Sequence, residues 1–211
     1  MTIISHQKKL AFIHIQKTGG TSISEGLQKY LSEGERKQCS PSNLYKHMTK
    51  KQILQKLPKD EAEKYIFFTV VRHPITLLFS LYNFVRDVCR DHPLHKMCTR
   101  MSFDRFVSVI CGKDEESKKL GKISNPIVNT LLQHGQHVFF DRETTVIHFE
   151  NLRHEFQDFC TNVLNIDRVE LPHINSSSLI SDPSLVPCTQ ETRNLVYEKF
   201  KKDFELLGYT I

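Results

Sequence analysis

A segment near the N-terminus combines residue types that suit a phosphate group. Residues 16–22 read Gln-Lys-Thr-Gly-Gly-Thr-Ser, with one lysine, two adjacent glycines and three hydroxyl side chains. Glycines let the main chain approach an anion closely and adopt positive φ, and the N–H groups at a helix start attract negative charge. We expect Lys17 to supply a mobile cation and the next five residues to surround the anion: Thr18, Gly19, Gly20, Thr21 and Ser22. The alternative is an ordinary Gly-Gly turn with exposed polar side chains.

The order of residues in this segment excludes the commonest phosphate-binding loop. In that loop, GxxxxGK[ST], the lysine follows the second glycine, whereas Lys17 precedes both glycines here. The segment therefore does not indicate an ATPase or GTPase.

A second pair of residues could hold another phosphate. Arg72 follows an apolar run, and Ser80 lies in the helix that is expected to begin at Pro74. A guanidinium binds phosphate through two parallel hydrogen bonds, and a serine hydroxyl can donate a third. The alternative is that Arg72 pairs with a surface carboxylate and that Ser80 is merely tolerated in the helix.

Two strand–loop–helix units must position these residues. The apolar residues 9–15 predict a buried strand that ends before the Gly-Gly pair, and residues 65–71 predict a central strand that is covered on both faces. Pro74 suits the first turn of a helix. That helix has an apolar face at helical spacing, made of Leu77, Leu78, Leu81, Phe84, Val85 and Val88.

The remaining elements complete an alternation of strands and helices. Thr49 and Gln52 form a predicted capping box for a short helix that ends at Pro58. We expect helices over 103–111, 125–132 and 151–164, a strand over 144–150, and a last helix from Thr189 to Gly208. The pattern predicts a single α/β domain over residues 1–211, with a central, mostly parallel sheet, helices on both faces and a P-loop-like nucleotide-binding architecture. Ligands of such sheets bind at the carboxyl ends of the strands.

Composition narrows the function classes. The 211 residues are 39% hydrophobic and 25% charged, with a net charge of +5 that is spread along the chain. This balance favours anionic ligands and does not indicate nucleic-acid binding. No apolar run approaches the roughly 20 residues of a membrane span, and no signal peptide is evident. We expect a cytoplasmic protein if the chain is complete, and a Golgi lumenal one if an N-terminal anchor has been removed.

Cysteines and histidines do not form a metal motif. Cys39, Cys89, Cys98, Cys111, Cys160 and Cys188 include no CxxC pair, so we expect structural thiols; a disulfide between Cys89 and Cys98 is the alternative. His92 with His95, and His134 with His137, each lack an evident third ligand. No metal is expected.

The motifs resemble those of the sulfotransferase superfamily, particularly its carbohydrate O-sulfotransferase branch. FIHIQKTGGTS (12–22) is similar to the family's loop for a 5'-phosphosulfate, and VVRHPITLLFSLYNF (70–84) is similar to its 3'-phosphate segment. LPHINSSS (171–178) and FKKDFELLGY (200–209) are weaker similarities. Together they extend over nearly the whole chain.

The resemblance implies a donor and a set of binding residues. The donor would be 3'-phosphoadenosine 5'-phosphosulfate, leaving 3'-phosphoadenosine 5'-phosphate as product, and no metal would be needed. Lys17 would contact the bridging oxygen and the leaving 5'-phosphate, with residues 18–22 around the phosphosulfate. Arg72 and Ser80 would hold the 3'-phosphate, and Ser177 would lie in a loop that closes over the nucleotide.

Sulfuryl transfer to a hydroxyl also needs a general base, for which histidine is the usual choice near neutral pH. We expect His47 in this role, because it precedes the capped helix in a His-x-x-Thr-like context similar to that of the carbohydrate branch. The alternative is a surface histidine bound to its own helix cap. His14 is expected in the core, and His73 is a candidate loop residue.

Two other functions remain open. A small-molecule kinase of P-loop-like architecture would need a magnesium-binding aspartate and a lysine inside the loop, and neither is evident. A non-catalytic receptor for the nucleotide or for a sulfated glycan would retain Lys17, Arg72 and Ser80. Among acceptors a hydroxyl on a glycan or glycolipid is favoured. The sequence does not determine the oligomeric state.

Overall fold

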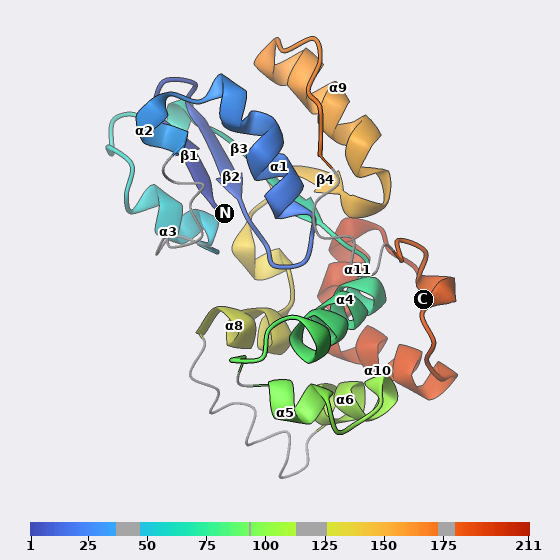
Figure 1. Ribbon diagram of the computed structural model, residues 1–211. Helices are drawn as coiled ribbons and strands as arrows, with labels where there is room; N and C mark the ends of the chain where they lie inside the picture. The colour runs from blue at the N-terminus through green and yellow to red at the C-terminus, as the bar shows by residue number, and fades with distance from the viewer. Residues whose placement is uncertain (37–46, 93, 113–125, 173–179) are drawn as a thin grey trace. The chain divides into compact units, whose positions relative to one another are not determined.

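The computed structural model describes residues 1–36, 47–92, 94–112, 126–172 and 180–211, and Figure 1 shows its ribbon. The chain forms two compact units. The first contains Met1–Val71 and Val138–Asn175, and the second contains Arg72–His137 and Ser176–Ile211. The expectation of a single domain over residues 1–211 stays a prediction.

The first unit is built on a four-stranded sheet. Its strands are β1 (Ile3–Ser5), β2 (Leu10–Ile13), β3 (Ile66–Val71) and β4 (Thr145–His148), in the order β1-β2-β3-β4. β2, β3 and β4 are parallel, and β1 is antiparallel to β2 at the edge. The predicted α/β class with a mostly parallel sheet is therefore confirmed.

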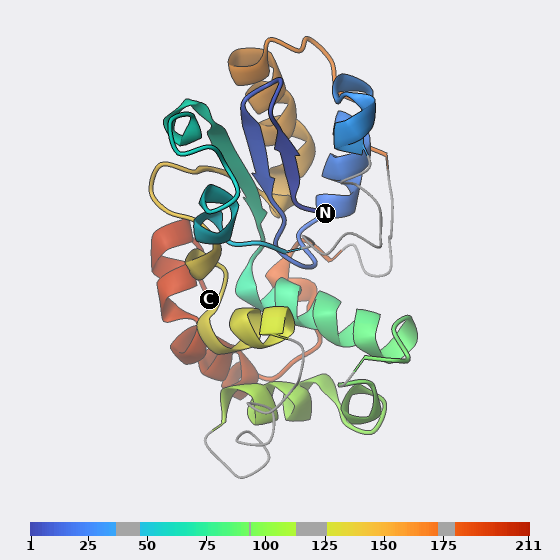
Figure 2. The ribbon, with the colours of Figure 1, turned by 90° about the vertical axis from the view of Figure 1, so that its left-hand side faces the viewer.

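Alternation along the strands divides the core between the two faces of this sheet. Helices α1 (Gly20–Leu27) and α9 (Leu152–Leu164) pack on one face, as Figures 1 and 2 show. This layer contains Leu10, Phe12, Ile23, Leu27, Phe68, Ile147, Phe156 and Phe159. Phe67 points to the opposite face because successive strand residues alternate, and there the side chain of Lys50 from α3 (Lys50–Leu54) covers its ring.

The predicted capping box in the first unit is confirmed, but α3 ends at Leu54 and not at Pro58 as expected. Thr49 caps α3, and its hydroxyl accepts the Gln52 N–H while the Gln52 side chain accepts the Thr49 N–H, which completes the capping box. The short helix α2 (Glu33–Arg36) was not anticipated.

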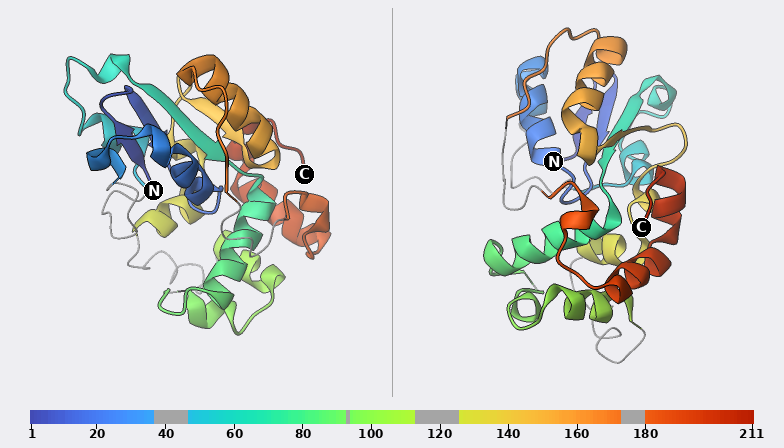
Figure 3. Two further views of the ribbon diagram at one scale, coloured as in Figure 1. Left: turned by 45° about the horizontal axis from the view of Figure 1, so that its top comes forward. Right: turned by 90° about the vertical axis from the view of Figure 1, so that its right-hand side faces the viewer.

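The second unit is helical among its described residues. It contains α4 (Pro74–Asp87), α5 (His95–Cys98), α6 (Phe103–Cys111), α8 (Pro126–His134), α10 (Gln190–Lys199) and α11 (Lys201–Leu207). Helices α4, α6 and α10 pack against one another, as Figure 3 also shows. Their shared core includes Leu78, Leu81, Val85, Phe106, Val107, Ile110, Val196, Phe200 and Phe204. Pro74 occupies the first turn of α4 as predicted.

Two expectations about the elements are corrected. The edge strand β1 was not predicted, because three residues are too short to show alternation. The last helix is not continuous, since Phe200 has φ −111° and ψ 26° and separates α10 from α11. Asp203 and Phe204, which follow this break, are both buried.

Two further expectations concern membranes and cysteines. Within the described ranges, no helix has the length and apolar character needed to cross a membrane. Cys89, Cys98, Cys111, Cys160 and Cys188 are all thiols, so the alternative of a Cys89–Cys98 disulfide is wrong. Cys39 lies outside the described residues.

Candidate active site

The loop Gln16–Ser22 joins the end of β2 to the start of α1 and has a tightly defined main chain. Lys17 has φ 63° and Gly19 has φ 82°, both in the left-handed region. The buried Thr18 donates its hydroxyl to the Ile15 carbonyl at 2.9 Å, which closes the turn. Because Gly20 begins α1, the N–H groups at the start of this helix belong to the loop itself. The arrangement suits an anion.

The two glycines are required for different reasons. Gly19 needs its left-handed conformation, which side chains disfavour. Gly20 does not, but a Cβ atom there would lie 2.0 Å from Cδ2 and 2.1 Å from Nε2 of His14. The ring of His14 therefore packs directly on the main chain of the loop. Thr21 is exposed and Ser22 is partly exposed in the first turn of α1.

His47 lies beside this same ring. The two imidazole centroids of His14 and His47 are 4.6 Å apart, and Nδ1 of His47 is 2.9 Å from the main-chain oxygen of His14. A carbonyl oxygen can only accept, so Nδ1 of His47 carries the proton and donates it. In the neutral ring Nε2 is then the basic nitrogen. The Nδ1 contact of His47 is thus to the residue that follows β2 rather than to α3, whose cap is formed by Thr49 and Gln52. The role of His47 stays a prediction.

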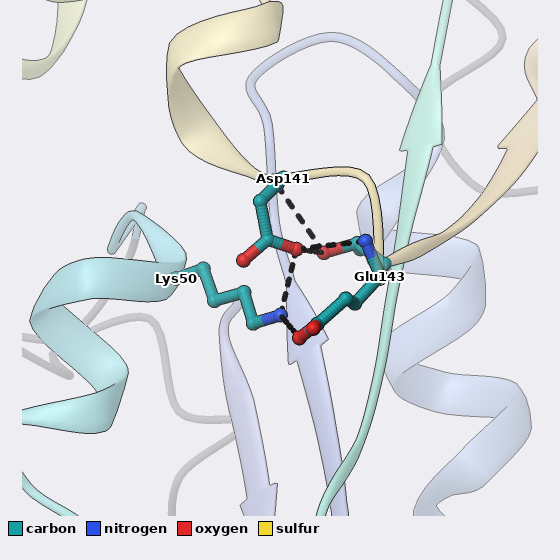
Figure 4. Close-up of polar contacts among 4 residues, drawn as sticks. Lys50, Asp141 and Glu143 are labelled. Atoms are coloured by element: carbon teal, nitrogen blue, oxygen red, sulfur yellow. Dashed lines mark hydrogen bonds and ion pairs between the residues drawn. The ribbon is translucent and has the colours of Figure 1, made fainter.

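The helix after His47 is anchored by a partly buried ion pair (Figure 4). Lys50 is 7% exposed, and its Nζ atom lies 2.7 Å from Oδ1 of Asp141 and 3.4 Å from Oε2 of Glu143. Partial burial raises the pKa of Asp141, but hydrogen bonds from Lys50 and Thr144 outweigh this effect and leave the pKa below its usual value. Since Lys50 follows His47 by three residues, the ion pair fixes the segment that carries His47.

Arg72 and Ser80 belong to the second unit. Arg72 directly follows the last residue of β3 and is only 3% exposed. Its Nε atom donates to the Thr76 hydroxyl at 3.1 Å, and Nη2 donates to the Ile180 carbonyl at 2.8 Å. Arg72 is therefore a buried residue, and its pairing with a phosphate or with a carboxylate stays a prediction. Ser80 is buried in α4, two turns after Arg72.

The other predicted residues have structural positions or fall outside the described ranges. His14 is buried, as expected. His73 caps α4, since its Nδ1 accepts the Ile75 N–H, and its Nε2 contacts the Thr210 carbonyl oxygen at 2.8 Å. Ser177 lies outside the described residues. Within the described part of the chain, no group of three or more His, Cys, Asp or Glu residues could hold a metal ion.

Three residues with polar roles were missed by sequence reasoning. Thr76 contacts the guanidinium of Arg72, and Gln136 contacts its main chain at 2.9 Å and 2.7 Å. Asp203 is buried and accepts the Gln136 N–H at 2.7 Å. One signal was available: Asp203 lies between Phe200 and Phe204 in an apolar stripe, where an acidic residue needs a partner.

These features define an α/β protein with a strand–loop–helix segment suited to a phosphate group, a histidine beside it, and a buried arginine at the end of a central strand. The family model described as "Sulfotransferase family" matches residues 1–210. The chain therefore belongs to the sulfotransferase family. Comparisons with curated proteins and with solved structures found no match.

Proposed function

We propose that this sulfotransferase takes a sulfuryl group from 3'-phosphoadenosine 5'-phosphosulfate and transfers it to a hydroxyl group of a carbohydrate. The loop Gln16–Ser22 supports the 5'-phosphosulfate part of the proposal, because its main chain suits an anion. Arg72 and Ser80 would bind the 3'-phosphate. The similarity to the carbohydrate branch and the net charge of +5 favour a glycan or glycolipid acceptor.

The position of His47 is the observation that carries this proposal. His47 contacts His14, and the ring of His14 packs on Gly20 of the loop. A base for the acceptor hydroxyl must lie near the sulfuryl group, and this contact places His47 next to the segment that would hold it. The hydrogen bond from Nδ1 to the His14 carbonyl sets the tautomer that a base requires.

Each residue then has a defined role in an in-line displacement. His47 accepts the acceptor's proton at Nε2 while the acceptor oxygen forms its bond to sulfur. The bond between sulfur and the bridging oxygen breaks, and Lys17 stabilises the negative charge that develops on the leaving 5'-phosphate. Positioning and charge stabilisation supply most of the rate in a transfer of this kind.

The test measures transfer from a radiolabelled donor to a panel of glycans, glycolipids and small alcohols. Loss of a general base should lower kcat by about 10²- to 10⁴-fold in His47→Asn. Lys17→Met should also lower kcat, because its cation is needed in the transition state. His154→Asn and Lys8→Met are matched controls at exposed positions and should keep full activity.

Binding of the nucleotide separates the alternatives. We expect calorimetry to show tighter binding of 3'-phosphoadenosine 5'-phosphate than of ATP. Preferential ATP binding would replace the donor assignment with the kinase alternative. Selective binding of the 3'-phosphorylated nucleotide without transfer to any acceptor would favour the receptor.

A further inference from the structure

Gln136 contacts both main-chain groups of Arg72. Its Oε1 accepts the Arg72 N–H at 2.9 Å, and its Nε2 donates to the Arg72 carbonyl at 2.7 Å. Gln136 is 0% exposed. The carboxamide thus pairs with Arg72 as a neighbouring strand would, one residue beyond the end of β3.

Gln136 is itself held by a buried carboxylate. Asp203, in the first turn of α11, is 1% exposed. Its Oδ2 accepts the Gln136 N–H at 2.7 Å, and its Oδ1 accepts the His137 N–H at 3.0 Å and contacts Nδ1 of His137 at 2.7 Å. The turn therefore presents three nitrogen groups to one carboxylate.

A glycine makes this approach possible. Gly135 has φ 90°, and a Cβ atom there would lie 2.6 Å from Oδ2 of Asp203 and 2.9 Å from its Cγ. Any side chain at position 135 would push the carboxylate away from the turn. The close contact therefore depends on Gly135 as much as on the charge of Asp203.

A buried polar network of this kind is costly unless every member is satisfied. An apolar residue at position 136 would leave the N–H and carbonyl of Arg72 without these hydrogen bonds in a buried place. The network also fixes the main chain from which the guanidinium extends. The guanidinium, at the far end of the Arg72 side chain, is fixed by its hydrogen bonds to the Thr76 hydroxyl and the Ile180 carbonyl.

We propose that Gln136, oriented by Asp203, is a positioning residue that holds Arg72 for recognition of a 3'-phosphate. This inference rests on the proposed function, since that function assigns Arg72 to the 3'-phosphate. Gln136 acts through Arg72 and does not touch the nucleotide itself. All of the residues in the network belong to the second unit.

The test compares the affinities for 3'-phosphoadenosine 5'-phosphate and adenosine 5'-phosphate by calorimetry. The ratio of the two Kd values isolates recognition of the 3'-phosphate. Charge-assisted hydrogen bonds to the 3'-phosphate should make the wild-type protein bind 3'-phosphoadenosine 5'-phosphate roughly 10- to 100-fold more tightly than adenosine 5'-phosphate. Gln136→Met keeps the length of the side chain and removes both hydrogen bonds, so it should shrink the ratio toward that of Arg72→Ala.

Matched variants distinguish positioning from a general loss of structure. Gln133→Met, at an exposed site three residues earlier, should keep the wild-type ratio. In the Arg72→Ala background, Gln136→Met should cause no further change in the ratio. If Gln136→Met does not fold, Asp203→Asn carries the test, because it preserves volume and should reduce the ratio while binding of adenosine 5'-phosphate persists.

The outcomes separate the two proposals. A wild-type ratio near one would overturn the donor assignment and this inference with it. A large wild-type ratio that persists in folded Gln136→Met, or in Asp203→Asn, would overturn the positioning role alone. An equal loss of affinity for both nucleotides would show that Gln136 is only structural.

Discussion

Replacing Gly20 by alanine tests the contact that links the loop to the two histidines. The added Cβ would lie 2.0 Å from the His14 ring, so the ring must retreat by about 1.4 Å to reach the 3.4 Å of an ordinary contact. The movement of the His14 ring is restricted by two neighbouring rings. Its centroid lies 5.7 Å from that of the stacked Phe12 ring and 4.6 Å from that of His47. Overpacking of this kind costs about 1–3 kcal/mol. Alanine regains at most about 1 kcal/mol from its better helix propensity.

We therefore expect Gly20→Ala to lower the free energy of unfolding by about 1–2 kcal/mol. The melting temperature should fall by about 2–8 °C for a chain of this size. The assay is urea-induced unfolding followed by circular dichroism. Gly34→Ala is the control, since nothing lies within 4 Å of the Cβ it would add in α2, and it should be neutral or stabilising.

A double-mutant cycle decides whether the His14 ring is the cause. His14→Ala removes the three atoms nearest to the new Cβ, so in that background Gly20→Ala should lose most of its cost, giving a coupling energy of about 1 kcal/mol or more. An equal cost in both backgrounds would refute the reasoning and point to the backbone of the loop instead.

Three further predictions concern a core phenylalanine, the Lys50–Asp141 ion pair and two buried cysteines. Phe68→Ala should destabilise the protein by about 3–5 kcal/mol, because Phe68 is fully buried and stacks on Phe12 at 4.8 Å; a loss under about 1 kcal/mol in urea unfolding would contradict this packing. Because the pKa of Asp141 is lower in the folded state, its contribution is present above its unfolded pKa of about 3.9 and is lost as pH falls through the folded value. Asp141→Asn should accordingly show a shallower loss of stability in acid, and a profile parallel to that of the wild-type protein would be evidence against the ion pair. Burial raises the pKa of the Cys98 and Cys160 thiols to about 12, so both should react with a disulfide reagent at pH 8 only after unfolding, as peptide mapping would show; rapid labelling of the native protein would be inconsistent with their burial.

Much of the fold could be predicted because its signals are local. The apolar run of β3, the capping box at Thr49 and the start of α4 at Pro74 each depend on residues adjacent in sequence. The loop Gln16–Ser22 was also recognisable, since glycines and hydroxyl residues after a strand have a direct physical meaning. The break at Phe200 was not predicted, because the contact of Asp203 with Gln136 beyond it connects distant parts of the chain and leaves no local signal.

The candidate site was only partly predictable for the same reason. The sequence predicted that Gly19 and Gly20 let the main chain approach an anion, and no local pattern indicated that the His14 ring would pack on Gly20. His47 was chosen from its context, and its contact with His14 joins residues more than thirty positions apart. Gln136 gave no signal, because a lone glutamine is ordinary in any sequence. The contacts of His14, His47 and Gln136 depend on packing between residues far apart in the sequence, which local patterns do not reveal.

The parallel pairing of β3 with β4 has a consequence for the newly made chain. Val71 pairs with His148, so residues 72–144 must be synthesised before the strand that covers this side of β3 exists. At roughly 5–20 residues per second the interval is about 4–15 s. During that time one edge of the apolar segment Ile66–Val71 is open to pairing with another chain. If translation slows over residues 72–144, the chain stays longer in this aggregation-prone state. The yield of folded protein should therefore depend on how quickly these residues are translated.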